Sequence, residues 1–472
     1  MRYLAFDIGA ESGRAIIGDL RDGKLTLSEV HRFANGGVRV KDSLYWDILG
    51  LWREIKNGMR AAAQSGDVAA VGVDTWGVDY ALLDQNGDLL GNPYCYRDAR
   101  TDGALERVCA KLGRERIFEI TGIQFMPINT LYQWAVERER NPGKVALARR
   151  CLMIPDLLHY WMTGVMANEY TIASTSQAFD ARARTWSSEL LEGVGMPASL
   201  FGDALMPGTK LGPLLPGVRD EAGISDATVV LVGSHDTASA VAAVPFAPGG
   251  GARAYISSGT WSLVGVEVDQ PVINAQALAA NITNEGGVDN KIRLLKNVMG
   301  LWLIQRCRAE WKAEGHDYSY DQITQMAHEA SGFPSIIDPN DDAFLHPADM
   351  RKAIAQKCQE TRQPVPSTPG EFARLIYASL AQAYRAVIEQ IEGLIGQRIE
   401  AIHVVGGGSR SHILNQLTAN VCQRPVIAGP VEGTAIGNVL TQAMGAGEIS
   451  SLAELREVVR QSFDIVRFEP KG

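Results

Sequence analysis

The sequence predicts an α/β fold built from two similar halves, and three observations support this. The chain opens with the order strand, strand, strand, helix, strand, which plain nucleotide-binding α/β folds do not show. The opening LAFDIGAESGRAIIG (4–18) returns as RAYISSGTWSLVGVE (253–267): an apolar strand, a turn of small residues with a hydroxyl, and a second apolar strand. A Gly/Pro-rich run, 245–251, separates the two copies. We therefore expect domains 1–244 and 245–472, each presenting one hairpin loop toward a shared cleft.

The first half begins with three antiparallel strands, predicted at 3–8, 14–20 and 25–33. A helical periodicity follows over 45–64, with one apolar face formed by Leu49, Trp52, Ile55 and Met59. An apolar strand at 68–73 then ends in polar residues.

The rest of the chain is read by the same signals. In the middle we expect a helix over 152–164 that Gly164 ends, loop or strand at 171–176, and a strand ending at Val232. The expected elements of the second half are strands at 253–257, 260–268, 399–405 and 425–428, helices at 372–394, 413–421 and 434–444, and a tail with one more helix and a terminal strand.

Composition excludes several classes of protein. The chain has 472 residues, 46% hydrophobic and 21% charged, and a formal net charge of −9, so no broad basic surface for nucleic acid is expected. No apolar run approaches the length of a membrane span, and we expect a cytoplasmic protein. The six cysteines form no CxxC pair and the histidines no HExxH motif, which favours free thiols and no structural metal.

Two hairpin loops are candidate phosphate sites. Asp7 ends the first strand and is followed by a small-residue loop to Arg14, whose backbone amides can face a phosphate while Asp7 holds Mg²⁺. The alternative is a plain hairpin turn with an Asx cap. The run Ser257–Thr260 is the matching loop of the second half.

A third glycine-rich turn lies at Gly406–Gly408, after an apolar strand and before a helix, where the backbone can approach a nucleotide closely. It is not GxGxxG, which argues against a dinucleotide site. The stretch GDLRDGKL (18–25) resembles a Walker A motif, but Leu25 replaces the required Ser/Thr and the stretch lies in a hairpin.

The segment LVGSHDTASAV (231–241) places Asp236 between a strand and a helix, where a carboxylate can face a cleft and act as a general base. The alternative is an ordinary helix N-cap. Asp74–Asp79, DTWGVD, is a polar strand end suited to sugar hydroxyls, and Trp76 is either a stacking surface for a sugar or a core residue.

These motifs, in this order, resemble those of the FGGY carbohydrate kinase family. Further strings shared with such kinases are YRDART (96–101), GIQFMPINTLYQ (122–133), SSGTWSL (257–263), LKNVMGLWL (295–303) and VIAGPVEGTAIGN (426–438), so the resemblance covers essentially 3–465. The family resembles actin and Hsp70-type ATPases in having two ribonuclease-H-like domains around an ATP cleft. The resemblance therefore implies that fold here.

The resemblance also implies roles for individual residues. Asp236 resembles the catalytic base, and Asp7 a residue that holds the Mg²⁺ accompanying ATP. The ketose-binding positions are Gly77, His235, Thr237 and Asn297. The ATP-binding positions are Ala10, Glu11, Ser12, Gly13, Arg14, Thr260, Gln305 and Gly407.

The activity implied is phosphorylation of L-rhamnulose at its C1 hydroxyl, with a small ketose and ATP as partners and neither nucleic acid nor membrane. A kinase of another deoxyketose, L-fuculose above all, is the alternative within this class. An actin/Hsp70-like ATPase without a sugar substrate is the alternative from another class, although no peptide-binding segment follows. A sugar-sensing regulator would need a DNA-binding segment, for which the first strand leaves no room.

Overall fold

The computed structural model describes residues 1–345 and 347–471, and the chain forms two compact units. Unit 1 contains Met1–Ala243, Glu267–Leu294 and Gly433–Ser462. Unit 2 contains Val244–Val266, Leu295–Glu432 and the residues from Phe463 onward. Unit 1 is thus assembled from three separate stretches of sequence, the last of them near the end of the chain.

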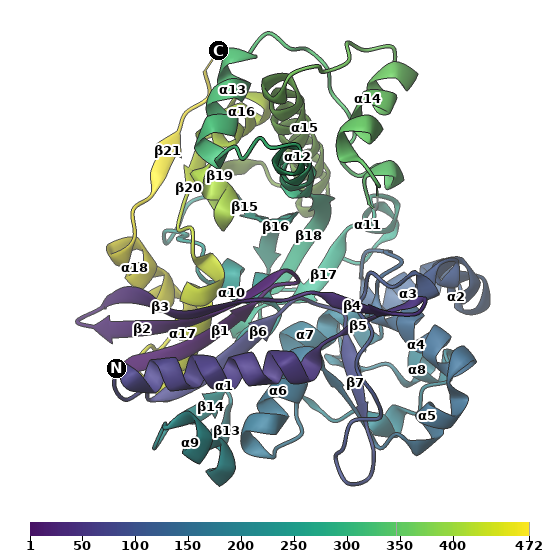
Figure 1. The fold of residues 1–472 in the computed structure, drawn as a ribbon, viewed down its shortest axis with the longest axis vertical. Coiled ribbons are helices and arrows are strands. Elements are labelled where there is room, and N and C mark those ends of the chain that lie inside the picture. Colours follow the sequence, from purple (N-terminus) through teal and green to yellow (C-terminus); the bar gives the residue numbers. More distant parts are fainter. Residues whose placement is uncertain (346, 472) are drawn as a thin grey trace. The chain divides into compact units, whose positions relative to one another are not determined.

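Unit 1 is organised around one sheet with the strand order β13-β14-β6-β1-β2-β3 (Figure 1). The strands are β1 (Arg2–Ile8), β2 (Ser12–Arg21), β3 (Lys24–Ala34), β6 (Ala70–Thr75), β13 (Lys210–Pro213) and β14 (Thr228–Val230). The first three pair antiparallel, as predicted, whereas β6 is parallel to β1 and β14 is parallel to β6.

Alternation along β1 sends its side chains to two different faces of the sheet. Leu4, Phe6 and Ile8 join the hydrophobic core that includes residues of α1 (Ile48–Gln64) and α6 (Ile154–Thr163). The opposite face is covered by α17 (Gly433–Ala446), where Gln442 Nε2 donates to the Leu4 carbonyl at 3.0 Å. The strand-end carboxylate Asp7 belongs to the α17 face by the same alternation.

Helix α1 begins three residues later than predicted. The strand β5 (Ser43–Trp46) occupies the expected first turn, and Asp47 then caps the helix by accepting from the Gly50 amide. Ile55 and Met59 are buried as expected, but Leu49 is 62% exposed. The buried stripe passes through Ile48, Leu51 and Ile55, and the helical period places Leu49 off this stripe.

Unit 2 repeats the strand arrangement of unit 1. Its strands are β15 (Ala252–Ser258), β16 (Trp261–Val268), β18 (Ile292–Met299), β19 (Ile399–Val405), β20 (Val426–Ala428) and β21 (Val466–Phe468), of which β16 and β18 extend past the unit boundary. The order β18-β16-β15-β19-β20 matches β3-β2-β1-β6-β14. In both units the first strand pairs antiparallel with the second and parallel with the fourth.

Helices of unit 2 pack around α15 (Pro369–Ile395), which begins at a capping box of Thr368 and Glu371 and ends at the left-handed Gly396. The helices that contact α15 are α12 (Trp302–Ala313), α13 (Tyr320–Glu329) and α16 (His412–Cys422), whereas α14 (Met350–Glu360) contacts α12. The long predicted helix and the one after the glycine-rich turn are both confirmed.

The middle of the chain is more helical than predicted. Residues 171–176, expected as loop or strand, lie in α7 (Tyr170–Ala173) and a following 3₁₀ turn, because the Glu169 side chain accepts from the amides of Thr171 and Ile172. Helices that the periodicity did not indicate are α2 (Ala104–Leu112), α3 (Arg114–Thr121), α4 (Thr130–Arg140), α5 (Pro142–Leu147), α8 (Ser188–Gly193) and α9 (Pro216–Ala222).

The remaining elements are α10 (Asp236–Ala242), α11 (Ala275–Ala279), α18 (Leu452–Ser462), β4 (Gly37–Val40), β7 (Tyr80–Leu83), β8 (Arg150–Met153), β9 (Asn168–Glu169), β10 (Phe179–Asp180), β11 (Thr185–Trp186), β12 (Ala204–Leu205) and β17 (Thr283–Gly286).

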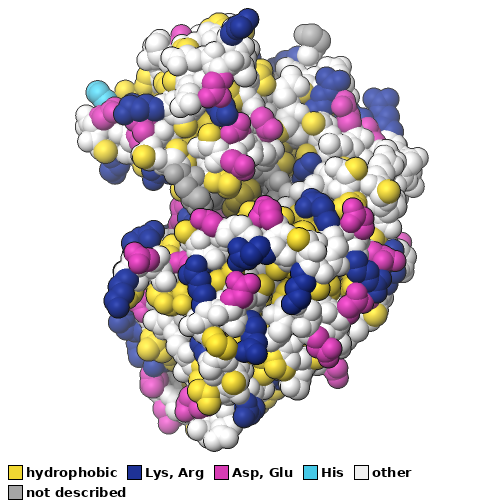
Figure 2. Space-filling model, turned by 90° about the vertical axis from the view of Figure 1, so that its right-hand side faces the viewer, with side chains coloured by type: hydrophobic (Ala, Val, Ile, Leu, Met, Phe, Trp, Pro, Cys, Tyr) yellow, Lys and Arg dark blue, Asp and Glu magenta, His cyan; other side chains and the backbone are white. Residues whose placement is uncertain are grey.

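Lys and Arg side chains are interspersed with Asp and Glu over the face shown in Figure 2. All six cysteines are free. Within residues 1–345 and 347–471, no helix is long and apolar enough to cross a membrane, and no three or more His, Cys, Asp or Glu side chains are grouped to hold a metal ion.

Candidate active site

Two carboxylates end neighbouring strands of the unit 1 sheet. Asp7 on β1 and Asp74 on β6 are register partners in a parallel pair, so both side chains point to the same face. Across the antiparallel pair, Asp7 is opposite Arg14, and Arg14 Nη2 lies 2.5 Å from Asp7 Oδ2. The structure thus brings together Asp7 and Arg14, which the resemblance assigns to the metal and to ATP.

Asp74 opens the polar strand end that the sequence analysis connected with sugar hydroxyls, but its place beside Asp7 was not predicted. It is fully buried, its Oδ2 accepts from Asn438 Nδ2 of α17 at 2.6 Å, and its Oδ1 has no hydrogen-bond partner. Burial and the charges on Asp7 and Asp236 raise the pKa of Asp74 well above its ordinary value, against the opposing effects of Asn438 and Arg14. Three carboxyl groups therefore act on one another at this edge of the sheet.

Asp236 is the first residue of α10 and not its cap. The N-cap is His235, with extended backbone, so the alternative interpretation of Asp236 as an N-cap is wrong. The preceding segment adds to the sheet edge, because the Thr75 amide donates to the Ser234 carbonyl at 2.9 Å. The Asp236 side chain keeps 31% of its surface exposed, and its Oδ1 accepts from Thr237 Oγ1 at 3.0 Å. This carboxylate is therefore accessible to a ligand.

Gly77 lies against His235, another of the predicted ketose-binding residues. A Cβ at Gly77 would be 3.4 Å from both His235 Nε2 and Thr175 Oγ1. The next residue, Val78, has φ +69°, a costly conformation for a β-branched side chain, and its amide donates to Thr175 Oγ1 at 3.2 Å. Thr130 Oγ1 donates to the Val78 carbonyl at 2.6 Å and helps to fix this turn. Thr175 was not predicted as a site residue, since its segment was expected only as loop or strand.

Trp76 is a core residue, so its alternative interpretation is the correct one. It is 6% exposed, and its ring centroid lies 4.0 Å from that of Trp46. Both indole N–H groups donate to Asp79 Oδ2, at 2.9 Å from Trp76 and 2.6 Å from Trp46. Burial raises the pKa of Asp79 to about 6, against these donors. Asp79 thus anchors aromatic packing beneath the Gly77 turn.

His235 contacts a buried ion pair that sequence reasoning missed. Arg293 Nη2 lies 3.2 Å from His235 Nδ1 and 3.1 Å from Glu285 Oε2, and the Glu285 oxygen lies 3.3 Å from the same His235 nitrogen. Burial alone would raise the pKa of Glu285, but the Arg293 charge and the His235 contact outweigh it and lower that pKa. A basic residue inside the apolar run of β18 was the available signal.

The loop between β1 and β2 contains the other predicted ATP positions of unit 1, Ala10, Glu11, Ser12 and Gly13. It is closed by the Gly9 amide, which donates to the Ser12 carbonyl at 2.9 Å. The Glu11 carboxylate is exposed, and its Oε1 is 3.9 Å from Arg97 Nη1.

The predicted ATP positions of unit 2 converge on its own hairpin. Thr260 Oγ1 donates to Gln305 Oε1 at 3.3 Å, which joins the β15–β16 loop to α12. A Cβ at Gly406 would lie 2.9 Å from the Ser258 carbonyl oxygen, and one at Gly408 would lie 1.9 Å from Ser258 Oγ. A Cβ at Gly407 would meet no atom within 4 Å. Of the three glycines, Gly407 is the one open to a ligand. Asn297, a predicted ketose position, lies on β18 in the part that belongs to unit 2.

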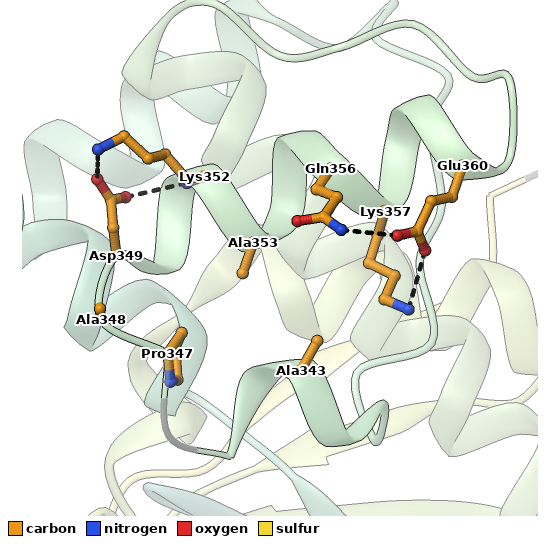
Figure 3. Close-up of a pocket in the computed structure, with 9 residues that line it drawn as sticks. All are labelled: Ala343, Pro347, Ala348, Asp349, Lys352, Ala353, Gln356, Lys357 and Glu360. Atoms are coloured by element: carbon orange, nitrogen blue, oxygen red, sulfur yellow. Dashed lines mark hydrogen bonds and ion pairs between the residues drawn. The ribbon is translucent and has the colours of Figure 1, made fainter.

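A cavity of about 380 Å³ lies in unit 2 between α14 and the turn Asp342–Phe344 (Figure 3). Its lysines are already paired: Lys352 with Asp349 at 3.0 Å, and Lys357 with Asp341 at 2.9 Å and Glu360 at 3.0 Å. None of the predicted site residues lines it. It is therefore separate from the predicted ketose and ATP positions.

Comparison with known proteins gives consistent matches along nearly the whole chain. Residues 2–243 match the N-terminal domain, and 254–446 the C-terminal domain, of the FGGY family of carbohydrate kinases. A rhamnulokinase of Bacteroides thetaiotaomicron is 45% identical over 470 residues, which are 99% of this chain and 96% of that protein. A rhamnulokinase of Bacillus subtilis is 42% identical over 472 residues, 100% of this chain and 96% of the relative.

Solved structures match the fold at much lower identity. A gluconate kinase of Lactobacillus acidophilus superposes with a TM-score of 0.80 at 16% identity, covering 100% of this chain and 94% of the other. A glycerol kinase of Plasmodium falciparum with ADP gives 0.77 at 14% identity over 100% and 94%. Together with the repeated strand order, they confirm the predicted α/β fold with two ribonuclease-H-like domains. The chain belongs to the FGGY family of carbohydrate kinases.

Proposed function

We propose that this protein transfers the γ-phosphoryl group of ATP to the C1 hydroxyl of L-rhamnulose, giving L-rhamnulose 1-phosphate. The observation that carries the chemistry is the accessible carboxylate of Asp236 in the first turn of α10, beside His235 and Gly77. The choice of ketose is supported by full-length relatives that are named rhamnulokinases. A location in the cytoplasm, where ATP is available, completes the proposal.

Asp236 serves as the general base in this mechanism. Its carboxylate accepts the proton of the C1 hydroxyl as transfer proceeds, a contribution of about 10²–10⁴-fold in rate. Thr237 donates to Oδ1 and so restricts the orientation of the carboxylate. His235, Thr237 and Gly77, with Asn297, form the proposed ketose-binding set.

The ATP-binding set that we propose draws on both units. In unit 1 it comprises Ala10, Glu11, Ser12, Gly13 and Arg14, and in unit 2 Thr260, Gln305 and Gly407. Loop amides and the Arg14 guanidinium donate to phosphate oxygens, which stabilises charge on the transferring group. Because phosphoryl transfer depends mainly on positioning and charge stabilisation, these groups are expected to account for most of the rate.

The residues present fit the Mg²⁺ that accompanies ATP. Asp7 offers a carboxylate at the strand end, and the unpartnered Oδ1 of buried Asp74 lies on the neighbouring strand. Mg²⁺ keeps several waters and needs only one or two protein carboxylates beside the phosphates. We assign Asp7 to hold it, and when bound it neutralises phosphate charge.

The test is ADP release measured over a panel of ketoses, with NMR assignment of the phosphorylated carbon. We expect ADP formation to require a ketose, L-rhamnulose to give the highest kcat/KM, and the product to carry phosphate on C1. A preference for L-fuculose would leave the kinase class intact and change the substrate. Equal ATP hydrolysis with and without sugar would overturn the sugar-kinase proposal in favour of an actin/Hsp70-like ATPase.

A further inference from the structure

Arg293 is a charged side chain in the interior of the protein, where desolvation costs free energy. It is fully buried on β18, where its Nε donates to the Gly286 carbonyl at 2.8 Å and its Nη2 contacts both Glu285 and His235. Taking an ion pair out of water costs free energy that its mutual attraction often fails to recover. Stability alone therefore explains this pair poorly, and its contact with His235 suggests a role at the site.

The contact between Arg293 and His235 determines where the imidazole proton lies. A guanidinium has five N–H donors and no acceptor, so the nitrogen it meets must accept. Arg293 Nη2 is 3.2 Å from His235 Nδ1. In the tautomer that satisfies this contact, Nδ1 is unprotonated and the ring proton is on Nε2.

Glu285 is the competing influence on the same nitrogen, since its Oε2 lies 3.3 Å from His235 Nδ1 and would favour a proton there. The Glu285 carboxylate is closer to Arg293, at 3.1 Å, and the guanidinium charge already compensates it. A proton on Nδ1 would also face the Arg293 N–H directly. The arrangement thus favours the ring with its proton on Nε2.

We propose that Arg293 is a positioning residue that holds His235 as a neutral Nε2–H donor directed at Asp236 and the bound ketose. His235 Nε2 lies 3.5 Å from Asp236 Oδ1 and 3.4 Å from the position a Cβ would take at Gly77. A neutral donor orients a sugar oxygen without competing with Asp236 for the transferred proton. This inference rests on the proposed function for its consequence but not for the tautomer itself.

The other groups around His235 are consistent with this assignment. From α10 it faces Asp236, from β17 Glu285 and from β18 Arg293. Its backbone amide donates to Thr171 Oγ1 at 3.2 Å, and that hydroxyl donates to Glu169 Oε2 at 2.7 Å. These two bonds fix the backbone at His235. The groups that act on the ring are therefore Arg293 and Glu285 at Nδ1 and Asp236 at Nε2, and the Asp236 carboxylate also favours a proton on Nε2.

The first measurement is ¹⁵N NMR of the full-length protein labelled at histidine, with the His235 signals assigned from their loss in His235→Gln. We expect an unprotonated Nδ1 and a protonated Nε2 at neutral pH. In Arg293→Met, which keeps an unbranched apolar stem but removes the guanidinium and leaves Glu285 alone beside the ring, Nδ1 should become protonated. In Glu285→Gln, which retains the Arg293 donor, the tautomer should stay as in the wild type. A protonated Nδ1 in the wild type, or a tautomer that follows Glu285 instead, overturns the proposal.

Kinetics of the same variants separate positioning from mere structural support. Arg293→Met should lower kcat/KM for the ketose about tenfold or more, the effect of losing one directed hydrogen bond, with the KM for ATP unchanged and a new ionisation in the pH profile. Arg293→Lys, also a pure donor, should restore the tautomer and much of the activity even if Arg293→Met folds poorly. Loss of activity in Arg293→Lys with the wild-type tautomer would refute the role in catalysis. Absence of any ketose activity in the wild type would refute the proposed function while leaving the tautomer result intact.

Discussion

The Asp236 carboxylate is accessible and does not cap α10, so the replacement Asp236→Asn tests its role as a base separately from its role in stability. Because His235 is the N-cap, we expect the melting temperature to change little. Loss of the base should lower kcat by about 10²-fold or more, with the KM for ATP nearly unchanged. Steady-state kinetics and thermal unfolding check both expectations. Turnover near the wild-type rate in the folded variant would remove Asp236 from the mechanism.

The glycine-rich turn of unit 2 offers a matched pair of substitutions. At Gly407 a new side chain enters open space, so Gly407→Val should leave stability unchanged and raise the KM for ATP well above the wild-type value. At Gly408 a Cβ would collide with Ser258 Oγ, so Gly408→Ala should lower the melting temperature. Kinetics and thermal unfolding of both variants provide the comparison. Unchanged ATP dependence in Gly407→Val would make the turn purely structural.

Sequence reasoning could propose the candidate residues that end strands or begin helices, because Asp7 and Asp236 are marked by local patterns. It missed those whose role depends on which segments pack together. Asp74 belongs to a motif that was noted, but its bond to Asn438, which is 364 residues away along the chain, has no local signal. Arg293 matters through His235, and no local pattern joins the two. A charge within an apolar strand is the kind of signal that deserves a search for a buried partner.

Among the short elements, α7 depends on one buried carboxylate. Glu169 accepts from the amides of Thr171, Ile172 and Ser234, at 2.8, 3.0 and 3.3 Å, so it joins α7 to the loop before Asp236. Burial raises the pKa of Glu169 from 4.5 to about 7, against these donors. A pKa raised on folding contributes stability at low pH that is lost as the pH rises through the folded value.

Glu169→Gln should therefore become more stable relative to the wild type as the pH rises from 5 to 8. The shift corresponds to about 3 kcal/mol in total, since each pKa unit is worth about 1.4 kcal/mol. Melting temperatures of both proteins at several pH values test this, and other titrating groups cancel in the difference. A difference that is constant with pH would show that Glu169 keeps its ordinary pKa.

Helices and strands with a clear hydrophobic periodicity could be predicted from the sequence. Helices whose first residue is fixed by a capping side chain could not. The opening strands and α15 follow from alternation and helical periodicity over long stretches. The start of α1 depends on Asp47, and Leu49 is exposed because it lies off the buried stripe through Ile48 and Leu51. Residues 171–176 lack a period of their own, and their helical turns form because Glu169 supplies the cap.

At the scale of the whole molecule, the boundary of the family domains differs from that of the compact units. The N-terminal family domain ends at residue 243, yet unit 1 also needs α17 from near the end of the chain. There Asn438 bonds Asp74, and Gln442 bonds the Leu4 carbonyl. Without α17, one face of the unit 1 sheet and a buried carboxyl group are left uncovered.

We therefore expect a fragment of residues 1–244 to lack a cooperative thermal transition and to bind hydrophobic dyes, while circular dichroism still shows secondary structure. The matched control joins residues 433–462 to that fragment through a Gly/Ser linker, and it should regain a sharper transition. A fragment 1–244 that unfolds cooperatively by itself would show that α17 is not required.

The late position of α17 has a consequence for synthesis on the ribosome. About 190 residues separate Ala243 from Gly433, where α17 begins. At the usual pace of translation the nascent chain needs roughly 10–40 s to make them. Throughout that interval the α17 face of the first sheet is bare, so the nascent chain is a natural client for chaperones, and slower growth at low temperature should improve its yield.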